Sequence, residues 1–85
     1  MKKSLFSKDY VLLLGQLRRA RRRAGLTQDQ LAERLASTQS FVSKCERGER
    51  RLDIIELRAW CRALDVPFPA FVAQFERTLD KGKGS

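Results

Sequence analysis

The sequence contains no histidine and only two cysteines and two prolines among its 85 residues. Without imidazole groups, histidine acid–base catalysis and histidine-ligated zinc sites are excluded. Cys45 and Cys61 are too far apart to form a C-x-x-C pair, so we expect no metal site. Each falls on an apolar helical position, which predicts two buried free thiols, with a disulfide between them as the alternative.

The sequence also lacks the glycine-rich motifs that bind nucleotide phosphates, and no pair of carboxylates lies in an evident cleft. No apolar run approaches the length that spans a membrane, and the VLLL stretch at residues 11–14 is too short for a signal peptide. We therefore expect a cytoplasmic protein that is not an enzyme, binds no cofactor and does not contact a membrane. The chain length leaves no room for a ligand-sensing domain, so no small-molecule ligand is expected either.

What the sequence has in excess is positive charge, with a formal net charge of +8. Residues 1–51 carry thirteen Lys and Arg against five Asp and Glu, whereas residues 52–85 carry five of each sign. The whole net charge therefore lies in the first part of the chain. A one-sided basic field of this size favours a polyanionic partner, and double-stranded DNA is the partner expected.

The hydrophobic periodicity predicts an all-α fold, a compact five-helix bundle without strands. It forms a single domain over residues 1–85, with a core from about residue 7 to residue 79 and a frayed tail at 80–85. The helices are expected at residues 7–24, from Thr27, at about 39–46, from Asp53, and after a start containing Pro67 and Pro69. Capping-box patterns begin the second and fourth helices, at Thr27 with Gln30 and at Asp53 with Glu56.

Apolar positions in the last two helices predict their inward faces. The fourth helix is expected to turn Ile54 or Ile55 to the core, together with Leu57, Trp60, Cys61 and Leu64. The apolar stripe of the fifth helix carries more aromatic side chains than so small a core requires. This surplus favours a homodimer, with packing in the domain's own core as the alternative, and the candidate interface residues are Phe68, Phe71, Val72 and Phe75.

Three residues, Ala36 to Thr38, separate the second and third helices, a spacing typical of a helix-turn-helix. Thr38 is a good N-cap, and Val42 with Cys45 gives the third helix a narrow inward stripe. The outward side chains are suited to reading base edges in the major groove, because Gln pairs with adenine, Ser adapts to several bases and Lys donates to guanine or phosphate. The candidate base-reading residues are Gln39, Ser40, Ser43 and Lys44.

The stretch GLTQDQLAERLASTQSFVSKCERGERR, at residues 25–51, resembles the helix-turn-helix of the phage Cro/repressor-type (XRE) transcriptional regulators. The resemblance covers about residues 17–66 and implies a bundle of the lambda-repressor-like DNA-binding type. It implies that Gln28 binds a phosphate and braces Gln39. It also implies phosphate contacts for Arg47, Arg50 and Arg51, with Arg18 and Arg22 flanking the same groove.

Two positions in the turn depart from that family pattern. Ala36 stands where glycine is usual, so a left-handed backbone there would cost about 1 kcal/mol. Ser37 stands where a buried aliphatic residue is usual. Phe41 is expected to cover the edge of the core, with packing over the turn or contact with DNA as the alternatives. Glu46 is expected to pair with an arginine of the first or second helix.

The sequence thus predicts a sequence-specific double-stranded DNA-binding transcriptional regulator, expected to be a repressor, that inserts the helix at about residues 39–46 in the major groove. The alternative is a protein-partner module of the antitoxin type, in which the C-terminal helix holds another protein. The FPAFVAQF stretch at residues 68–75 motivates that alternative.

Overall fold

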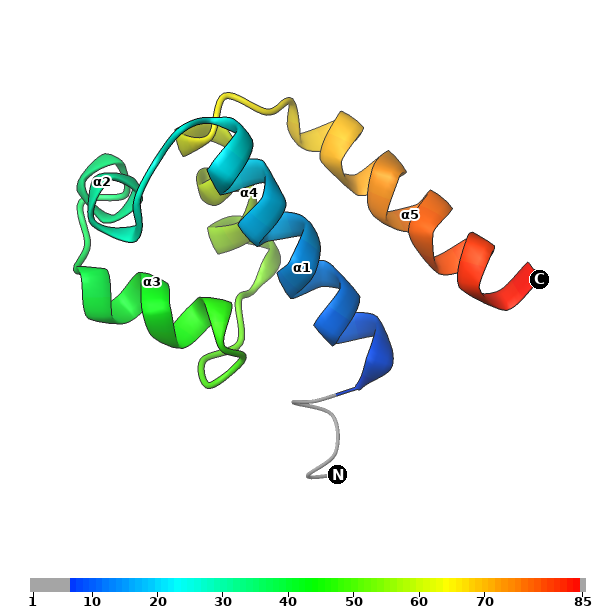
Figure 1. Cartoon of the computed structure of the whole chain (residues 1–85). Helices are drawn as coiled ribbons and strands as arrows, with labels where there is room; N and C mark the ends of the chain where they lie inside the picture. Colours follow the sequence, from blue (N-terminus) through cyan, green and yellow to red (C-terminus); the bar gives the residue numbers. More distant parts are fainter. Residues whose placement is uncertain (1–6, 85) are drawn as a thin grey trace.

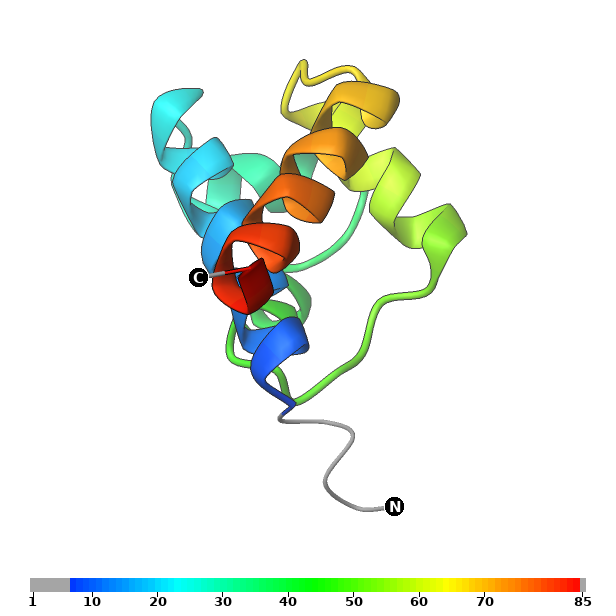
Figure 2. The same cartoon turned by 90° about the vertical axis from the view of Figure 1, so that its right-hand side faces the viewer.

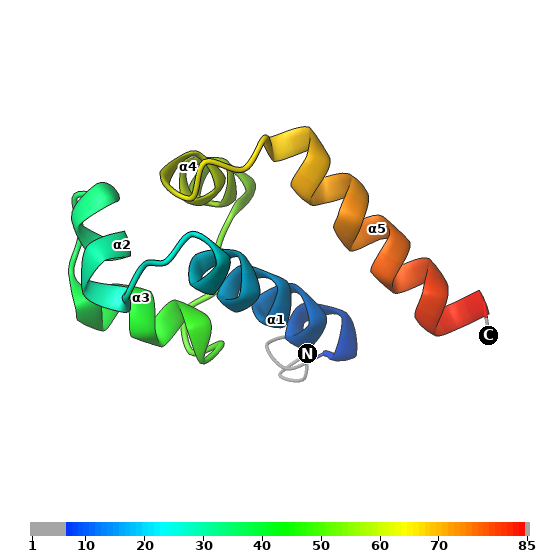
Figure 3. The ribbon, with the colours of Figure 1, turned by 45° about the horizontal axis from the view of Figure 1, so that its top comes forward.

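A computed structural model describes residues 7–84, and these residues form five α-helices without a strand. The helices are α1 (Lys8–Arg23), α2 (Gln28–Arg34), α3 (Gln39–Glu46), α4 (Ile54–Ala63) and α5 (Phe68–Gly84). Helix α2 packs on α3, and α1 contacts both α3 and α5 (Figure 1). The views from the side and from above place α1 between the α2–α3 pair and α5 (Figures 1 and 3). The predicted all-α, five-helix fold is confirmed.

The starts of the first four helices are set by side-chain caps. In each, an oxygen of the N-cap residue accepts a hydrogen bond from the backbone N–H three residues later, which satisfies a donor that the helix itself leaves unpaired. These N-caps are Ser7, Thr27, Thr38 and Asp53. Both predicted capping boxes are present, because the side-chain oxygens of Gln30 and Glu56 accept a hydrogen bond from the N-cap backbone N–H. The residue at which each of these four helices begins is therefore determined by its cap.

The turn between α2 and α3 is left-handed at Ala36, with φ of 54°. Two backbone hydrogen bonds close it, from Ser37 N to Ala32 O at 2.9 Å and from Ala36 N to Glu33 O at 3.1 Å. This is the pattern of a Schellman C-cap, for which glycine is the usual residue. The alanine thus adopts the strained conformation anticipated from the sequence, at a cost of about 1 kcal/mol, and Ser37 beside it is exposed.

The core draws on every helix and is centred on Trp60, Leu17, Leu31 and Val42, each at most 1% exposed. The expectation that Ile54 or Ile55 joins it was wrong, since these side chains are 66% and 72% exposed. Ile55 lies about 200° around the helix from Leu57, on the opposite side. Ile54 is the first residue of α4 and lies one turn before Leu57, ahead of the part of the helix that is buried. Two large apolar side chains therefore stand together on the surface.

The predicted frayed tail at 80–85 was also wrong over its described part, because α5 continues through Gly84. A cation such as Lys81 near the end of a helix is favourable beside the partial negative charge of the last carbonyls. Ser85 lies outside the described residues. The last turns of α5 extend beyond the other helices, on the side away from α3 (Figure 3).

Candidate nucleic-acid interface

Helix α3 presents the polar face that the sequence predicted. Val42 and Cys45 are fully buried, as expected for its inward stripe. Gln39, Ser40 and Lys44 are exposed, and Ser43 is half-buried. In the view of Figure 2, turned by 90° from Figure 1, α5 lies toward the viewer and α3 behind it, so the two helices occupy different sides of the molecule. The α3 face is therefore open for contact with another molecule.

A buried ion pair supports this helix from below. The Glu46 side chain is 3% exposed and the Arg21 side chain 11%. The guanidinium of Arg21 donates from Nε to Oε2 at 2.7 Å and from Nη2 to Oε1 at 3.1 Å. The expected partner of Glu46 is thus confirmed as an arginine of the first helix. Arg21 itself was not predicted as that partner, because it is one of five arginines at residues 18–23 and no local pattern marks it.

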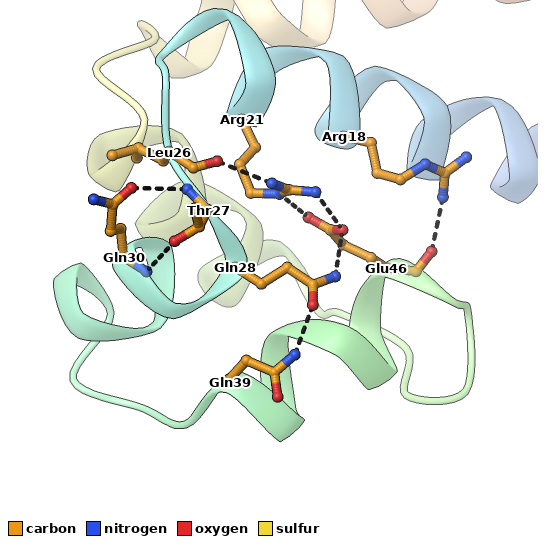
Figure 4. A network of polar contacts seen from close by, with 8 residues as sticks. All are labelled: Arg18, Arg21, Leu26, Thr27, Gln28, Gln30, Gln39 and Glu46. Atoms are coloured by element: carbon orange, nitrogen blue, oxygen red, sulfur yellow. Dashed lines mark hydrogen bonds and ion pairs between the residues drawn. The ribbon is translucent and has the colours of Figure 1, made fainter.

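Two further hydrogen bonds connect this ion pair to the exposed face of α3 (Figure 4). Gln28 donates from Nε2 to Glu46 Oε1 at 2.9 Å, and Gln39 donates from Nε2 to Gln28 Oε1 at 2.7 Å. An ionised carboxylate only accepts hydrogen bonds, so the NH₂ end of the Gln28 amide must face Glu46. The oxygen of Gln28 is then left to accept from Gln39, which fixes the orientation of the Gln39 amide as well. The predicted contact between Gln28 and Gln39 is present, and Figure 4 shows the Gln39 oxygen pointing away from Gln28.

The two α1 arginines predicted to flank the groove differ in their surroundings. Arg18 donates from Nη1 to the main-chain oxygen of Glu46 at 2.9 Å, so it satisfies a carbonyl at the C-terminal end of α3. Arg22 is exposed. Arg18 therefore ties α1 to α3, and Arg22 extends into solvent from the same helix.

Arg47, the C-cap of α3, contacts one residue before it in the sequence, Ser43, and one after it, Glu49. It donates from Nε and Nη2 to the carboxylate of Glu49, at 2.9 and 3.2 Å, and from Nη1 to the hydroxyl of Ser43. Both charged side chains are about half exposed. Their hydrogen bond lowers the pKa of the Glu49 carboxyl and raises the pKa of Arg47.

Arg50 ties the loop after α3 to the start of α4. It donates to both carboxylate oxygens of Glu56, at 3.1 and 2.7 Å, and to the main-chain oxygen of Arg51 at 2.7 Å. The hydrogen bond from Arg50 lowers the pKa of Glu56. The Arg51 guanidinium lies 4.2 Å from the centre of the Tyr10 ring. These two predicted phosphate-binding residues thus also contact the protein itself.

Phe41 lies at the edge of the core, as the favoured interpretation had it. Its ring centre is 6.1 Å from that of Trp60, with the planes tilted by 48°. The Arg50 guanidinium covers the ring from outside, 5.2 Å from its centre. Phe41 therefore packs between the core and the loop arginine.

The predicted dimer-interface residues of α5 differ in how deeply they are buried. Phe71 is 3% exposed and lies in the core, and its main-chain oxygen accepts from Gln16 Nε2 at 2.9 Å, so its proposed place in an interface was wrong. Phe68 packs against the core, and Phe75 is half-buried. Val72 is 43% exposed. More of this apolar stripe is buried within the domain than the sequence predicted, because α5 packs on both α1 and α4.

Cys45 and Cys61 are free and fully buried, as predicted, and burial raises the pKa of each thiol to about 11. Within the described part of the chain, no three His, Cys, Asp or Glu side chains gather as a metal site. None of the described helices is long and apolar enough to span a bilayer.

Comparison with known proteins gives one family match and several similar structures. A family model described as a helix-turn-helix domain matches residues 12–74. An XRE-family like protein from Pseudomonas syringae pv. tomato str. DC3000 is 43% identical, with 91% of this chain and 94% of that chain covered and a TM-score of 0.82.

Two more distant structures have a similar fold. A point mutant of the restriction-modification controller protein C.Esp1396I is 25% identical, with 86% of this chain and 92% of that chain covered and a TM-score of 0.77. The clp gene regulator ClgR from Corynebacterium glutamicum is 24% identical, with 85% and 94% covered and a TM-score of 0.72. No curated protein sequence matches the chain.

Proposed function

The chain belongs to the XRE-type helix-turn-helix family of DNA-binding transcriptional regulators, and from this premise we propose that it is a repressor that reads a double-stranded site with α3 in the major groove. The observation that supports this most directly is the hydrogen bond between Gln28 and Gln39. It holds an exposed amide at the front of α3 in one orientation, with its oxygen outward. A Gln presented in this way matches the N6 and N7 edge of adenine.

Sequence choice is assigned to the exposed side chains of α3. Gln39 and Ser40 lie on its first turn, and Ser43 and Lys44 follow one turn later. Together they offer donors and acceptors to neighbouring base pairs, and Lys44 also suits a phosphate. Packing of Val42 and Cys45 in the core keeps this face turned outward.

Affinity is assigned to the basic residues around α3, which neutralise phosphates and release counterions. The proposed phosphate contacts are those of Gln28, Arg18, Arg22, Arg47, Arg50 and Arg51. A guanidinium has five N–H donors, so an arginine that already binds a carboxylate can still donate to a phosphate. The placement of the entire net charge in residues 1–51 supports this assignment.

We further propose a cytoplasmic homodimer of one domain per chain, without catalytic activity. A two-fold dimer places two recognition helices about 34 Å apart, on successive major-groove faces of a palindrome. Ile54 and Ile55 on α4 and Val72 on α5 are among the exposed large apolar side chains, and we assign such an interface to them.

Selection of bound sites from random double-stranded DNA tests the proposal. We expect a palindromic site with half-sites about 10 base pairs apart, and its binding should weaken steeply as salt is raised. Failure to enrich any sequence, with equal affinity for all DNA, would contradict it.

A further inference from the structure

At the end of α3, Ser43, Arg47 and Glu49 form a linked group whose arrangement bears on base choice. Arg47 reaches back one helical turn to the Ser43 hydroxyl, while its Nε and Nη2 donate to the two oxygens of Glu49. These contacts use three of the five guanidinium donors, which leaves two N–H groups for a phosphate. The group lies on the proposed DNA-reading face, with Ser43 one turn after Gln39.

The hydroxyl of Ser43 has one hydrogen to donate and lone pairs with which to accept. In helices, such a hydroxyl often donates to the main-chain oxygen four residues earlier. Thr78 does so in this chain, from Oγ1 to the oxygen of Gln74 at 3.1 Å. Ser43 instead accepts from Arg47. Because a guanidinium has no lone pair to offer, this contact uses an acceptor position of Ser43 and leaves its hydrogen for another partner.

We propose that Arg47 and Glu49 are positioning residues that present Ser43 as a hydrogen-bond donor, so that Ser43 selects a base with an acceptor on its major-groove edge. The inference rests on the proposed function, since it takes α3 to lie in the major groove. The bases with such an acceptor are guanine at N7 and O6, adenine at N7 and thymine at O4. Cytosine presents its N4 amino group there, a donor that cannot accept the Ser43 hydrogen and could meet only the second lone pair of the hydroxyl, so cytosine is disfavoured.

Glu49 is needed because an exposed arginine is otherwise free to sample many rotamers. Two parallel hydrogen bonds from a guanidinium to a carboxylate fix the plane and direction of the fork. Lysine has a single ammonium on a flexible stem and cannot make that forked contact. Replacing Arg47 by lysine therefore separates a requirement for the forked contact from a requirement for positive charge alone.

The test uses the full chain and sites selected from random double-stranded DNA by the wild type and four variants. Ser43→Ala identifies the base pair that Ser43 reads, as the position where the preference disappears. Arg47→Lys keeps the charge and removes the fork, and Glu49→Gln weakens the carboxylate clamp. Glu76→Gln, an exposed change on α5, is the matched control. Far-ultraviolet circular dichroism and urea unfolding establish that each variant is folded.

We expect the wild type to disfavour cytosine at the Ser43 position by about three- to tenfold, the range of one hydrogen bond. Arg47→Lys and Glu49→Gln should remove most of this preference at that base pair, while the position read by Gln39 keeps its own. An adenine there, whose only major-groove acceptor is N7, should lose a similar factor when it is replaced by its 7-deaza analogue.

Three results would overturn the inference: a Ser43→Ala variant with an unchanged site, a wild-type preference for cytosine, or unaltered discrimination in both Arg47→Lys and Glu49→Gln. If Arg47→Lys does not fold, Glu49→Gln alone decides, because Glu49 lies exposed in the loop. A wild type that selects no sequence at all would contradict the proposed function instead, so the two failures are distinguishable.

Discussion

The carboxylate of Glu46 and the guanidinium of Arg21 meet at 2.7 Å, beneath the helix whose outer face is proposed to read DNA. From this pair the hydrogen bonds run outward through Gln28 to Gln39. The orientation of an exposed amide on α3 thus depends on a charge held by α1. Helix packing and base reading are therefore coupled through one polar chain (Figure 4).

Arg21→Met should reduce the free energy of unfolding by about 3–5 kcal/mol, because it leaves a carboxylate buried without its partner. Urea unfolding measures this loss. Arg22→Ala is the matched control on the same helix, since Arg22 is exposed, and it should change stability by less than about 0.5 kcal/mol. The Arg21→Met, Glu46→Leu double variant should recover much of the loss. Similar stability for Arg21→Met and Arg22→Ala would show that the pair is unimportant.

Gln39→Ala should weaken binding to the selected site by about 1–3 kcal/mol and leave random DNA nearly unaffected, because a lost base contact costs only the specific complex. Gln28→Ala should reduce discrimination at the same base pair, since it removes the partner that orients Gln39. Fluorescence anisotropy with cognate and random duplexes provides both affinities. Gln74→Ala on α5 serves as the control. Equal losses on the two duplexes would refute the base-reading role.

Local features of the fold were predictable from the sequence because neighbouring residues determine them. Thr27 with Gln30 and Asp53 with Glu56 form capping boxes from side chains three residues apart. Val42 and Cys45 face the core because helical periodicity places both on one narrow stripe. The contact between Gln28 and Gln39 followed from the family resemblance rather than from such periodicity.

Contacts between distant residues were not predictable in the same way. Nothing in the sequence distinguishes Arg21 from the other arginines near it, and only the crossing of α1 over α3 brings it to Glu46. Likewise, Ile54 and Ile55 look like core residues although the start of α4 was predicted correctly, because their exposure depends on how α4 packs against the other helices. The partner of Arg47 depends on the path of the loop after α3, which turns at Gly48 with φ of 81°.

Arg22→Ala should reduce the slope of log affinity against log salt by about 0.9, the value for the loss of one phosphate contact on duplex DNA. Arg62→Ala, an exposed arginine of α4 in the electrically neutral part of the chain, is the matched control and should leave the slope unchanged. Titrations of one duplex at several salt concentrations determine both slopes. Identical slopes for Arg22→Ala and the wild type would remove Arg22 from the interface.

The two buried thiols predict a loss of stability at high pH. Burial raises the pKa of Cys45 and Cys61 from 9.0 to about 11, so the folded state holds these protons more tightly than the unfolded state does. Their contribution to stability is complete below pH 9 and is lost as the pH rises from 9 to about 11.

Urea unfolding across that pH range measures this contribution. The Cys45→Ala, Cys61→Ala double variant should show a shallower alkaline decline than the wild type. In addition, a thiol reagent at pH 8 should modify the unfolded chain quickly and the native chain slowly, because both sulfurs are inaccessible. Fast modification of the native protein would contradict the burial of these residues.

Replacing both Ile54 and Ile55 by Glu should convert the proposed dimer to a monomer, because it puts two charges where an apolar contact is required. The variant should remain folded, since both side chains are largely exposed and acidic residues in the first turn of a helix are favourable. Sedimentation at several concentrations should show a dissociation constant raised more than tenfold. Val11→Glu, at a 50% exposed position of α1, is the control. If the double variant stays dimeric and Val72→Glu dissociates, the interface belongs to α5; if neither dissociates, both surfaces are excluded.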